Sequence, residues 1–172
     1  DTDRSRGLGD VYKRQIYNRI DDSIKKIDVR STLEKHKDEY LYYKSDHHWT
    51  SLASYYSYQT LASSFKLDKT KKSDYTIYPV SNSFEGTLAN KTGSLKIKDE
   101  IDIYVPKTET DYVVTDESTN KKSRTIYHSE ALETKDNYAV FMGGNKSLFH
   151  INIDNDSKKH LLLIKDLSLI HI

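Results

Sequence analysis

The chain has 172 residues, with 27 basic and 26 acidic side chains, so its formal net charge is +1 at pH 7. This balance offers no basic surface for nucleic acid or for an anionic membrane. The sequence contains no Cys, which excludes disulfides, thiolate metal sites and cysteine catalysis, and no apolar run approaches the roughly 18 residues of a membrane-spanning helix.

The two ends of the chain look foreign to the protein. Residues 10–15 back-translate to DNA whose reverse complement encodes residues 167–172, as expected if one sequencing adapter flanks both ends. Segments added by a cloning or sequencing step do not belong in fold reasoning. We therefore interpret residues 1–15 and 167–172 as adapter-derived and residues 16–166 as one partial domain, within which basic and acidic residues balance.

The first third of this segment predicts helices around a short strand. Residues 16–27 have helical spacing, 27–29 form a strand candidate, and Ser31 opens a capping box that predicts a helix through residue 37. Residues 40–43 predict a strand. Thr50 is then a good N-cap for a helix of about four turns, whose apolar stripe consists of Leu52, Tyr55, Tyr56, Gln59, Leu61, Ala62 and Phe65.

The middle of the chain predicts a β-rich insertion at about residues 75–128. Alternating residues 75–80 predict an edge strand, because Pro79 cannot occupy a central one. Further strands are expected at 101–105, 112–114 and 124–127, with a polar turn at 116–122. Residues 84–88 and 90–93 have the composition of turns.

The last part returns to sequence typical of a core. Residues 138–142 predict a buried strand, 149–153 alternate, and 161–164 form an apolar run typical of a parallel strand. Helices and strands mixed in this way predict the α/β class.

The chemistry is concentrated in one run, Asp46-His47-His48-Trp49-Thr50. A carboxylate two residues before an imidazole can orient it as the base for a Ser nucleophile. Asp and His are also good metal ligands. The third interpretation is a strand end that happens to be rich in aromatic residues and surface histidines. The spacing alone leaves these three alternatives open.

Residues 42–50, with Ala53, Tyr55 and Tyr56 after them, resemble the DHHW protein family of bacteria. They resemble more distantly the SGNH-like acetyltransferases of alginate modification, of the AlgX and AlgJ type, which carry Asp-x-His-Trp. The resemblance extends to residues 84–88, 141–145 and 162–166. It implies a three-layer α/β/α SGNH-hydrolase-like core, incomplete at both ends.

The resemblance also implies roles for single residues. Asp46 and His48 match the Asp and His of a Ser-His-Asp triad, and His47 occupies the variable position between them. In these proteins an apolar strand ends in Asp-Ser, and that Ser is the nucleophile. Asp166 takes the position before the nucleophile, so the Ser is missing, Ser168 is not assigned to its role, and the chain is expected to be inactive.

Four more residues complete the expected site. Gly144 and Asn145 match the amide and side chain that SGNH enzymes use to hold an oxyanion, with a tight Gly-Gly turn as the equal alternative. Trp49 is interpreted as packing that seats the loop, and Thr50 as the helix cap. His128, His150 and His160 are interpreted as structural or surface residues.

The expected parent protein is an acyl esterase or O-acetyltransferase acting on a cell-envelope or secreted polysaccharide. It requires no cofactor and no metal, and a membrane protein is a candidate acyl donor. The expected location is extracytoplasmic, at the cell surface or anchored through an N-terminal segment outside this sequence. The alternatives are a non-catalytic carbohydrate-binding or scaffold domain and a metal-dependent hydrolase.

Overall fold

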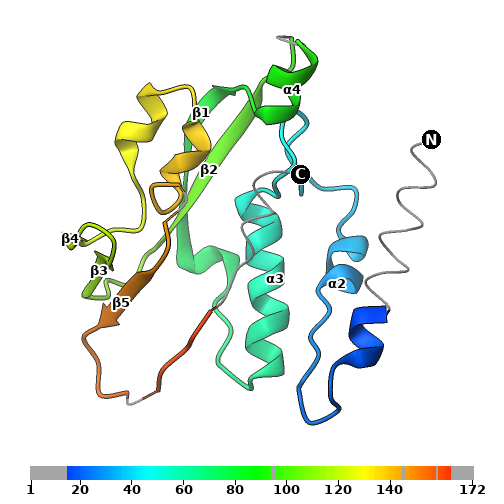
Figure 1. Cartoon of the computed structure of the whole chain (residues 1–172), viewed down its shortest axis with the longest axis vertical. Helices are drawn as coiled ribbons and strands as arrows, with labels where there is room; N and C mark the ends of the chain where they lie inside the picture. Colours follow the sequence, from blue (N-terminus) through cyan, green and yellow to red (C-terminus); the bar gives the residue numbers. More distant parts are fainter. Residues whose placement is uncertain (1–14, 94–95, 145, 158, 164–172) are drawn as a thin grey trace.

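The computed structural model describes residues 15–93, 96–144, 146–157 and 159–163, and two antiparallel sheets and several helices make up this part of the chain (Figure 1). The α/β class is confirmed, since helices and strands are mixed along the chain and the described strands form no barrel. No helix among the described residues is long and apolar enough to cross a membrane.

The central helix is α3, Ser51–Ser64, and it begins where the sequence predicts. The Oγ1 atom of Thr50 accepts a hydrogen bond from the Ala53 amide at 3.4 Å. Most of the predicted stripe is only half-buried, and Phe65 is exposed. The buried positions of the helix are the small residues Ala53, Ser57 and Ala62, of which only Ala62 belongs to the stripe. Small side chains let the helix lie close to its neighbours.

Helix α2, Arg30–Lys35, differs from the predicted start at Ser31. Val29 is the N-cap residue, and no side chain caps the helix. Burial of Leu33 in a cluster with Leu41 and Ala53 selects this register. Residues 15–19 are helical, whereas the strand expected at 27–29 is irregular chain with no strand partner.

Strands β1, Tyr75–Phe84, and β2, Asp99–Pro106, form a long antiparallel pair beside α3 (Figure 1). Pro79 lies in β1, which among the described residues pairs with β2 alone, as an edge strand allows. The register pairs Phe84 with Asp99, so the end of β1 and the beginning of β2 lie at the same end of the sheet.

The second sheet has the order β4-β3-β5, formed by Lys121–Ser123, Tyr112–Asp116 and Phe149–Ile153. Strand β4 therefore begins inside the predicted polar turn. The strand expected at 124–127 is reduced to a single bridge between Tyr127 and Phe141. All strand pairs in the described part of the chain are antiparallel.

Three further predictions from local sequence were wrong. Residues 138–142 do not form a strand, because Asn137–Val140 is a 3₁₀ helix (η3), and short apolar runs do not distinguish the two states. Residues 90–93 are not a turn, since helix α4, Thr87–Thr92, ends at Gly93 in a left-handed conformation. Leu161, Leu162 and Leu163 form no strand and are at least 75% exposed, as no described strand lies beside them. A second 3₁₀ helix, Ser129–Glu133 (η2), and a third, Lys72–Asp74 (η1), complete the elements.

The core has two parts that meet at one segment. One cluster contains Tyr43, Phe84, Ile101 and Val140, and the other contains Leu33, Leu41 and Ala53. Leu41 and Tyr43 are each 4% exposed and alternate along the chain, so each enters a different cluster. Burial of Leu41 in one cluster and of Tyr43 in the other therefore fixes the start of the segment that follows Tyr43.

Candidate active site

The Asp-His-His-Trp run lies in a short loop closed by one antiparallel bridge. Tyr42 and Trp49 form this bridge, in place of the strand predicted at residues 40–43. The Tyr43 amide donates to the His48 carbonyl at 3.2 Å, and the Thr50 amide donates to the Leu41 carbonyl at 2.8 Å. The loop therefore turns back on itself and presents Asp46, His47 and His48 together.

Asp46 and His48 form a short polar contact within the loop. The Oδ1 atom of Asp46 lies 2.5 Å from Nδ1 of His48 and 3.0 Å from the His48 amide. Asp46 is 4% exposed, and its carboxylate accepts from groups on two segments of the chain. An Nδ1–H held on a carboxylate leaves Nε2 of the imidazole as the free, basic nitrogen. The sequence prediction that these two residues act together therefore has the required geometry.

Hydrogen bonds decide the charge of Asp46. Burial raises its pKa, but the hydrogen bonds from the His48 ring, the Thr87 amide and the His48 amide outweigh burial. The net effect holds the pKa of Asp46 far below its ordinary value. Asp46 is therefore ionised next to His48 at neutral pH.

Aromatic stacking fixes the plane of the His48 ring. The rings of His48 and Tyr138 are stacked with centroids 4.1 Å apart and an interplanar angle of 16°. Burial and the negative charge of Asp46 raise the pKa of Tyr138 to about 12, so this ring is neutral. The ring of His47 also contacts that of His48, with centroids 4.0 Å apart and an interplanar angle of 35°.

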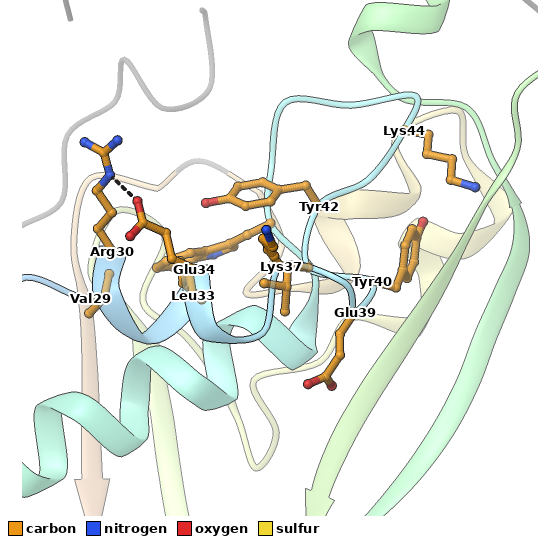
Figure 2. Close-up of a pocket in the computed structure, with 11 residues that line it drawn as sticks. Val29, Arg30, Leu33, Glu34, Lys37, Glu39, Tyr40, Tyr42 and Lys44 are labelled. Atoms are coloured by element: carbon orange, nitrogen blue, oxygen red, sulfur yellow. Dashed lines mark hydrogen bonds and ion pairs between the residues drawn. The ribbon is translucent and has the colours of Figure 1, made fainter. Parts of the chain in front are cut away.

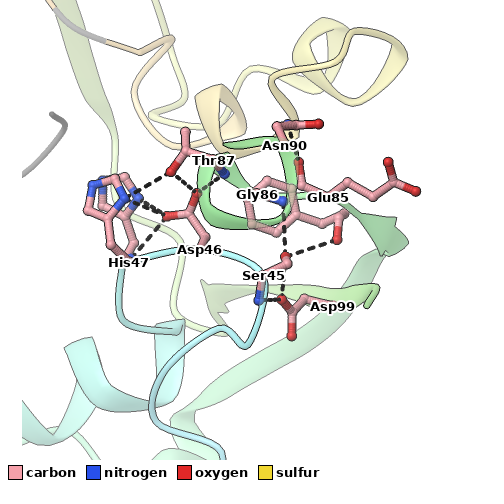
Figure 3. A network of polar contacts seen from close by, with 10 residues as sticks. Ser45, Asp46, His47, Glu85, Gly86, Thr87, Asn90 and Asp99 are labelled. Carbon is pink, nitrogen blue, oxygen red and sulfur yellow. Dashed lines mark hydrogen bonds and ion pairs between the residues drawn. The ribbon is translucent and has the colours of Figure 1, made fainter. Parts of the chain in front are cut away.

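A second layer of polar residues lies behind Asp46 (Figure 3). The Oδ2 atom of Asp46 accepts from the Thr87 amide at 2.7 Å and from the Thr87 hydroxyl at 3.0 Å. Ser45 is 1% exposed, and its hydroxyl donates to Asp99 at 2.5 Å while it accepts from the Gly86 amide at 2.9 Å. Local sequence gave no sign of these contacts beyond the similarity of residues 84–88 to the family.

The same loop offers three ligand atoms to a metal ion. One ligand atom each from Asp46, His47 and His48 lie within 4.8 Å of one another. Both oxygens of Asp46 already accept two hydrogen bonds each, so a metal would have to displace at least one donor. The donor set therefore fits a hydrogen-bonded carboxylate better than a metal ligand.

Gly144 lies in a tight turn that follows η3. Met142, Gly143 and Gly144 all have positive φ, at 59°, 70° and 82°. The Gly144 amide donates to the Phe141 carbonyl at 3.4 Å, and the turn directly follows η3, which carries Tyr138. The predicted Gly-Gly turn thus exists, with its Gly144 amide in a long internal hydrogen bond. Asn145 and Asp166 lie outside the described residues.

Trp49 lines a pocket next to the loop. The pocket has a volume of about 570 Å³ and lies between α2 and the segment that leads into the loop (Figure 2). Tyr40, Tyr42 and Trp49 contribute aromatic surface to it and are 38%, 53% and 38% exposed. Trp49 therefore closes the loop through its backbone and also presents its indole to solvent.

Comparison with known proteins agrees with the α/β class of the fold. The family model for the SGNH hydrolase-like domain, acetyltransferase AlgX, matches residues 2–146. The chain belongs to this family. Comparison with curated proteins gave no match.

Two solved structures are similar to the chain. One is a DHHW family protein from Eubacterium siraeum, with 26% identity and a TM-score of 0.62 over 76% of this chain and 45% of that one. The other is Bacillus cereus PatB1 with a sulfonyl adduct, with 18% identity and a TM-score of 0.62 over 81% of this chain and 49% of that one. The chain spans about half the length of each, and the likeness to PatB1 shows the fold alone.

Proposed function

We propose that the chain is the part of a Ser-His-Asp acyl esterase or O-acetyltransferase that carries the His and the Asp. In this proposal His48 is the general base and Asp46 orients it. The substrate is an acylated polysaccharide of the cell envelope or a secreted polysaccharide, outside the cytoplasm, with a membrane protein as candidate acyl donor. Family membership supports the acyl-transfer class.

The observation that carries the proposal is the 2.5 Å contact between Oδ1 of Asp46 and Nδ1 of His48. A buried carboxylate at Nδ1 fixes the tautomer and stabilises the imidazolium that forms during the reaction. Stacking on Tyr138 prevents rotation of the ring out of this hydrogen bond. A pre-oriented base of this kind loses little entropy when it takes a proton.

The proposed nucleophile is a Ser directly after Asp166 in the natural gene, where the printed sequence has Leu167. Its Oγ would attack the acyl carbonyl while Nε2 of His48 takes the hydroxyl proton. The tetrahedral intermediate would collapse to an acyl-enzyme as His48 returns that proton to the departing alcohol. Water or a sugar hydroxyl would then release the acyl group by the same steps in reverse.

Gly144 and Asn145 are the proposed oxyanion donors. Gly143 and Gly144 both have positive φ, and the hydrogen bond from the Gly144 amide to the Phe141 carbonyl is long at 3.4 Å. A developing oxyanion is a stronger acceptor than a peptide carbonyl at that distance. The Asn145 side chain would be the second donor, as in the SGNH enzymes that the sequence resembles.

The experiment begins with recovery of the full-length gene. A residue other than Ser after Asp166 would remove the nucleophile and, with it, the catalytic proposal. If Ser is present, the full-length protein should hydrolyse p-nitrophenyl acetate and react with phenylmethanesulfonyl fluoride. His48→Ala should lower kcat by at least about a thousandfold.

The matched control is His150→Ala, because His150 is a well exposed histidine on β5. Its kcat should stay within about twofold of wild type, since surface substitutions away from special features change little. Wild-type activity in the His48→Ala variant would contradict the role given to His48. The 172-residue chain itself should be inactive.

The pocket beside Trp49 favours a second candidate, a non-catalytic carbohydrate-binding or scaffold domain. Exposed aromatic rings such as those of Tyr42 and Trp49 suit the apolar faces of sugars. Titration of the chain with soluble oligosaccharides should then give binding that Trp49→Ala abolishes and His48→Ala leaves intact. Binding without any acyl chemistry in the full-length protein would favour this candidate over the first.

A metal-dependent hydrolase is the third candidate, and it depends on the cluster of Asp46, His47 and His48. It predicts a stoichiometric transition metal by elemental analysis of the purified protein, with loss of the metal in a His47→Ala variant. Full esterase activity after treatment with a chelator would contradict it.

A further inference from the structure

Asp46 is held by a segment 41 residues away in sequence. Thr87 gives both of its donors to the same oxygen, Oδ2, with the amide at 2.7 Å and the hydroxyl at 3.0 Å. The other oxygen, Oδ1, faces the ring and the amide of His48. The two carboxylate oxygens therefore have separate hydrogen-bond partners. These partners oppose rotation of the carboxylate group, which would interchange Oδ1 and Oδ2.

The Thr87 hydroxyl also contacts the other histidine of the loop, His47. Since its single proton is directed to Asp46, its oxygen can accept the Nδ1–H of His47, which lies 3.0 Å away. The hydroxyl thus lies between the carboxylate and the second imidazole. Loss of this one oxygen would remove a donor from Asp46 and an acceptor from His47 together.

The backbone around Thr87 is positioned by a buried network that does not involve His48. Asp99, at the beginning of β2, accepts from the Ser45 amide at 2.6 Å and from its hydroxyl at 2.5 Å. Ser45 then accepts the Gly86 amide at its hydroxyl, and the amides of Leu88 and Ala89 at its carbonyl. These bonds fix the beginning of α4 against the Asp46 loop, as Figure 3 shows.

The backbone at Gly86 lies in close contact with the loop that contains Ser45 and Asp46. A Cβ atom on Gly86 would lie 2.3 Å from the Cβ of Asp46 and 2.6 Å from its Oδ2. Only glycine lets the chain approach Asp46 closely enough for the next residue to reach Oδ2 with both donors. Gly86 and Thr87 therefore act as one unit, in which the first gives space and the second gives hydrogen bonds.

We propose that Thr87 is a positioning residue for the Asp46–His48 pair, in which its hydroxyl holds Oδ2 so that Oδ1 stays directed at Nδ1 of His48. Thr87 touches no reacting atom and acts through Asp46. The importance of this for catalysis rests on the proposed function, whereas the hold on Asp46 and His48 can be measured independently of any reaction.

The first test is NMR of the ¹⁵N-labelled 172-residue chain. The His48 Nδ1 proton should give a low-field resonance, because its hydrogen bond to Asp46 is short and charge-assisted. Thr87→Val keeps the shape of the side chain but removes the hydroxyl, so this resonance should move upfield or be lost by exchange with water. Thr87→Ser, which retains the hydroxyl, should keep it.

An unchanged His48 resonance in the folded Thr87→Val variant would overturn the proposal. Circular dichroism and the thermal midpoint establish whether each variant is folded. If Thr87→Val does not fold, Thr87→Ala provides the same comparison without the added methyl group in a polar site. A wild-type chain without any low-field His48 resonance would refute the Asp46–His48 pair, and with it the role of Thr87.

The second test uses the full-length protein with its expected Ser. Thr87→Val should lower kcat for p-nitrophenyl acetate on the order of tenfold to a hundredfold, since small misplacements of catalytic groups have effects of this size. KM should stay nearly unchanged, and Thr87→Ser should restore kcat. A loss that appears in KM alone would overturn a positioning role. Absence of activity in the wild-type protein would instead refute the proposed function and leave the NMR result valid.

Discussion

Gly86 lies so close to Asp46 that there is no space for a side chain at position 86. Gly86→Ala would put a Cβ atom 2.3 Å from that of Asp46 and 2.6 Å from the Ser45 carbonyl oxygen. The Ser45 carbonyl is backbone and cannot rotate away, so the loop or α4 must shift. We expect the free energy of unfolding to fall by about 1–3 kcal/mol, measured by urea denaturation.

Gly93→Asn is the control for that substitution. Gly93 has a left-handed conformation, at φ 68°, and open space around its Cα. Asn tolerates this conformation better than other residues do, so the variant should lose no more than about 0.5 kcal/mol. Equal losses at both positions would mean that contact with Asp46 is not the cause at Gly86.

Tyr43 is a buried residue whose side chain ends in a polar hydroxyl group. Its hydroxyl is the one buried side-chain polar atom without a hydrogen-bond partner in the part of the chain that the structure describes. Burial raises the pKa of Tyr43, so the ring stays neutral, and it packs edge-on against Phe84 at 5.2 Å. Tyr43→Phe should leave the free energy of unfolding unchanged or raise it by about 1 kcal/mol.

Tyr127→Phe is the matched comparison, because the Tyr127 hydroxyl donates to the Tyr104 carbonyl at 2.8 Å. The same chemical change there removes a made hydrogen bond and should cost about 0.5–1.5 kcal/mol in the same denaturation experiment. A larger loss for Tyr43→Phe than for Tyr127→Phe would show that the Tyr43 hydroxyl is satisfied in solution.

Among the elements, helix α3 has a side-chain cap at its beginning, which Thr50 provides. The Thr50 side chain accepts from the Ala53 amide at 3.4 Å and donates to the Tyr40 carbonyl at 2.8 Å. Thr50 thus joins the first turn of the helix to the segment that leads into the His48 loop. The cap is also the residue that follows the Asp-His-His-Trp run.

Thr50→Ala should therefore lower the free energy of unfolding by about 0.5–2 kcal/mol, the range for loss of an N-cap. Circular dichroism during thermal unfolding measures the loss. Thr50→Ser retains the oxygen and should recover most of the stability. Full stability of Thr50→Ala would mean that packing of Ala53 and Ser57, rather than the cap, fixes the start of α3.

Strands β1 and β2 also position residues that support the site. Their register pairs Phe84 with Asp99, which brings the turn after β1 and the first residue of β2 to the same end. Asp99 binds Ser45 there, and Thr87 binds Asp46 there. The long strand pair therefore carries the second layer of the site, although neither strand contributes Asp46 or His48.

For the whole molecule, low pH should unfold the protein through its buried carboxylates. The pKa values of Asp46 and Asp99 are lowered in the folded state, by hydrogen bonds that outweigh burial, and hydrogen bonds from Ser118 lower that of Asp116 to about 2. A lowered pKa adds stability above the unfolded value of 3.8, and this stability is lost as pH falls through the folded value. The thermal midpoint should therefore fall steeply between about pH 4 and pH 2.

Asp46→Asn supplies the comparison for the pH series. Without the ionised carboxylate the variant should be less stable at neutral pH, and its thermal midpoint should fall less steeply in acid. Asp102 acts in the opposite sense, because burial and the charge of Glu100 raise its pKa, so protonation of Asp102 favours folding. Parallel curves for the wild type and Asp46→Asn would show that Asp46 does not contribute to acid unfolding.

Local signals predicted the elements that depend on local physics. The Thr50 cap, helix α3, the edge strand with Pro79 and the strands at Ile101 and Tyr112 all follow from periodicity and turn chemistry. Local sequence patterns gave wrong predictions where the same residues can form either a strand or a helical turn and packing determines which one forms. The run at Tyr138 forms a 3₁₀ helix, and Phe141 after it makes a single bridge to Tyr127.

The sequence by itself determined the chemical content of the site. Asp46 and His48 are two residues apart, so a hydrogen bond between them needs only a tight loop, and the surrounding motif carried the family resemblance. The tertiary structure decided what holds that pair in place. Gly86 and Thr87 lie at least 40 residues from Asp46, and Asp99 lies 54 residues from its partner Ser45. The register of β1 with β2 brings these residues to the loop that contains Ser45 and Asp46. Contacts over such separations are absent from local patterns, because they arise from how strands pair and not from which residues are adjacent.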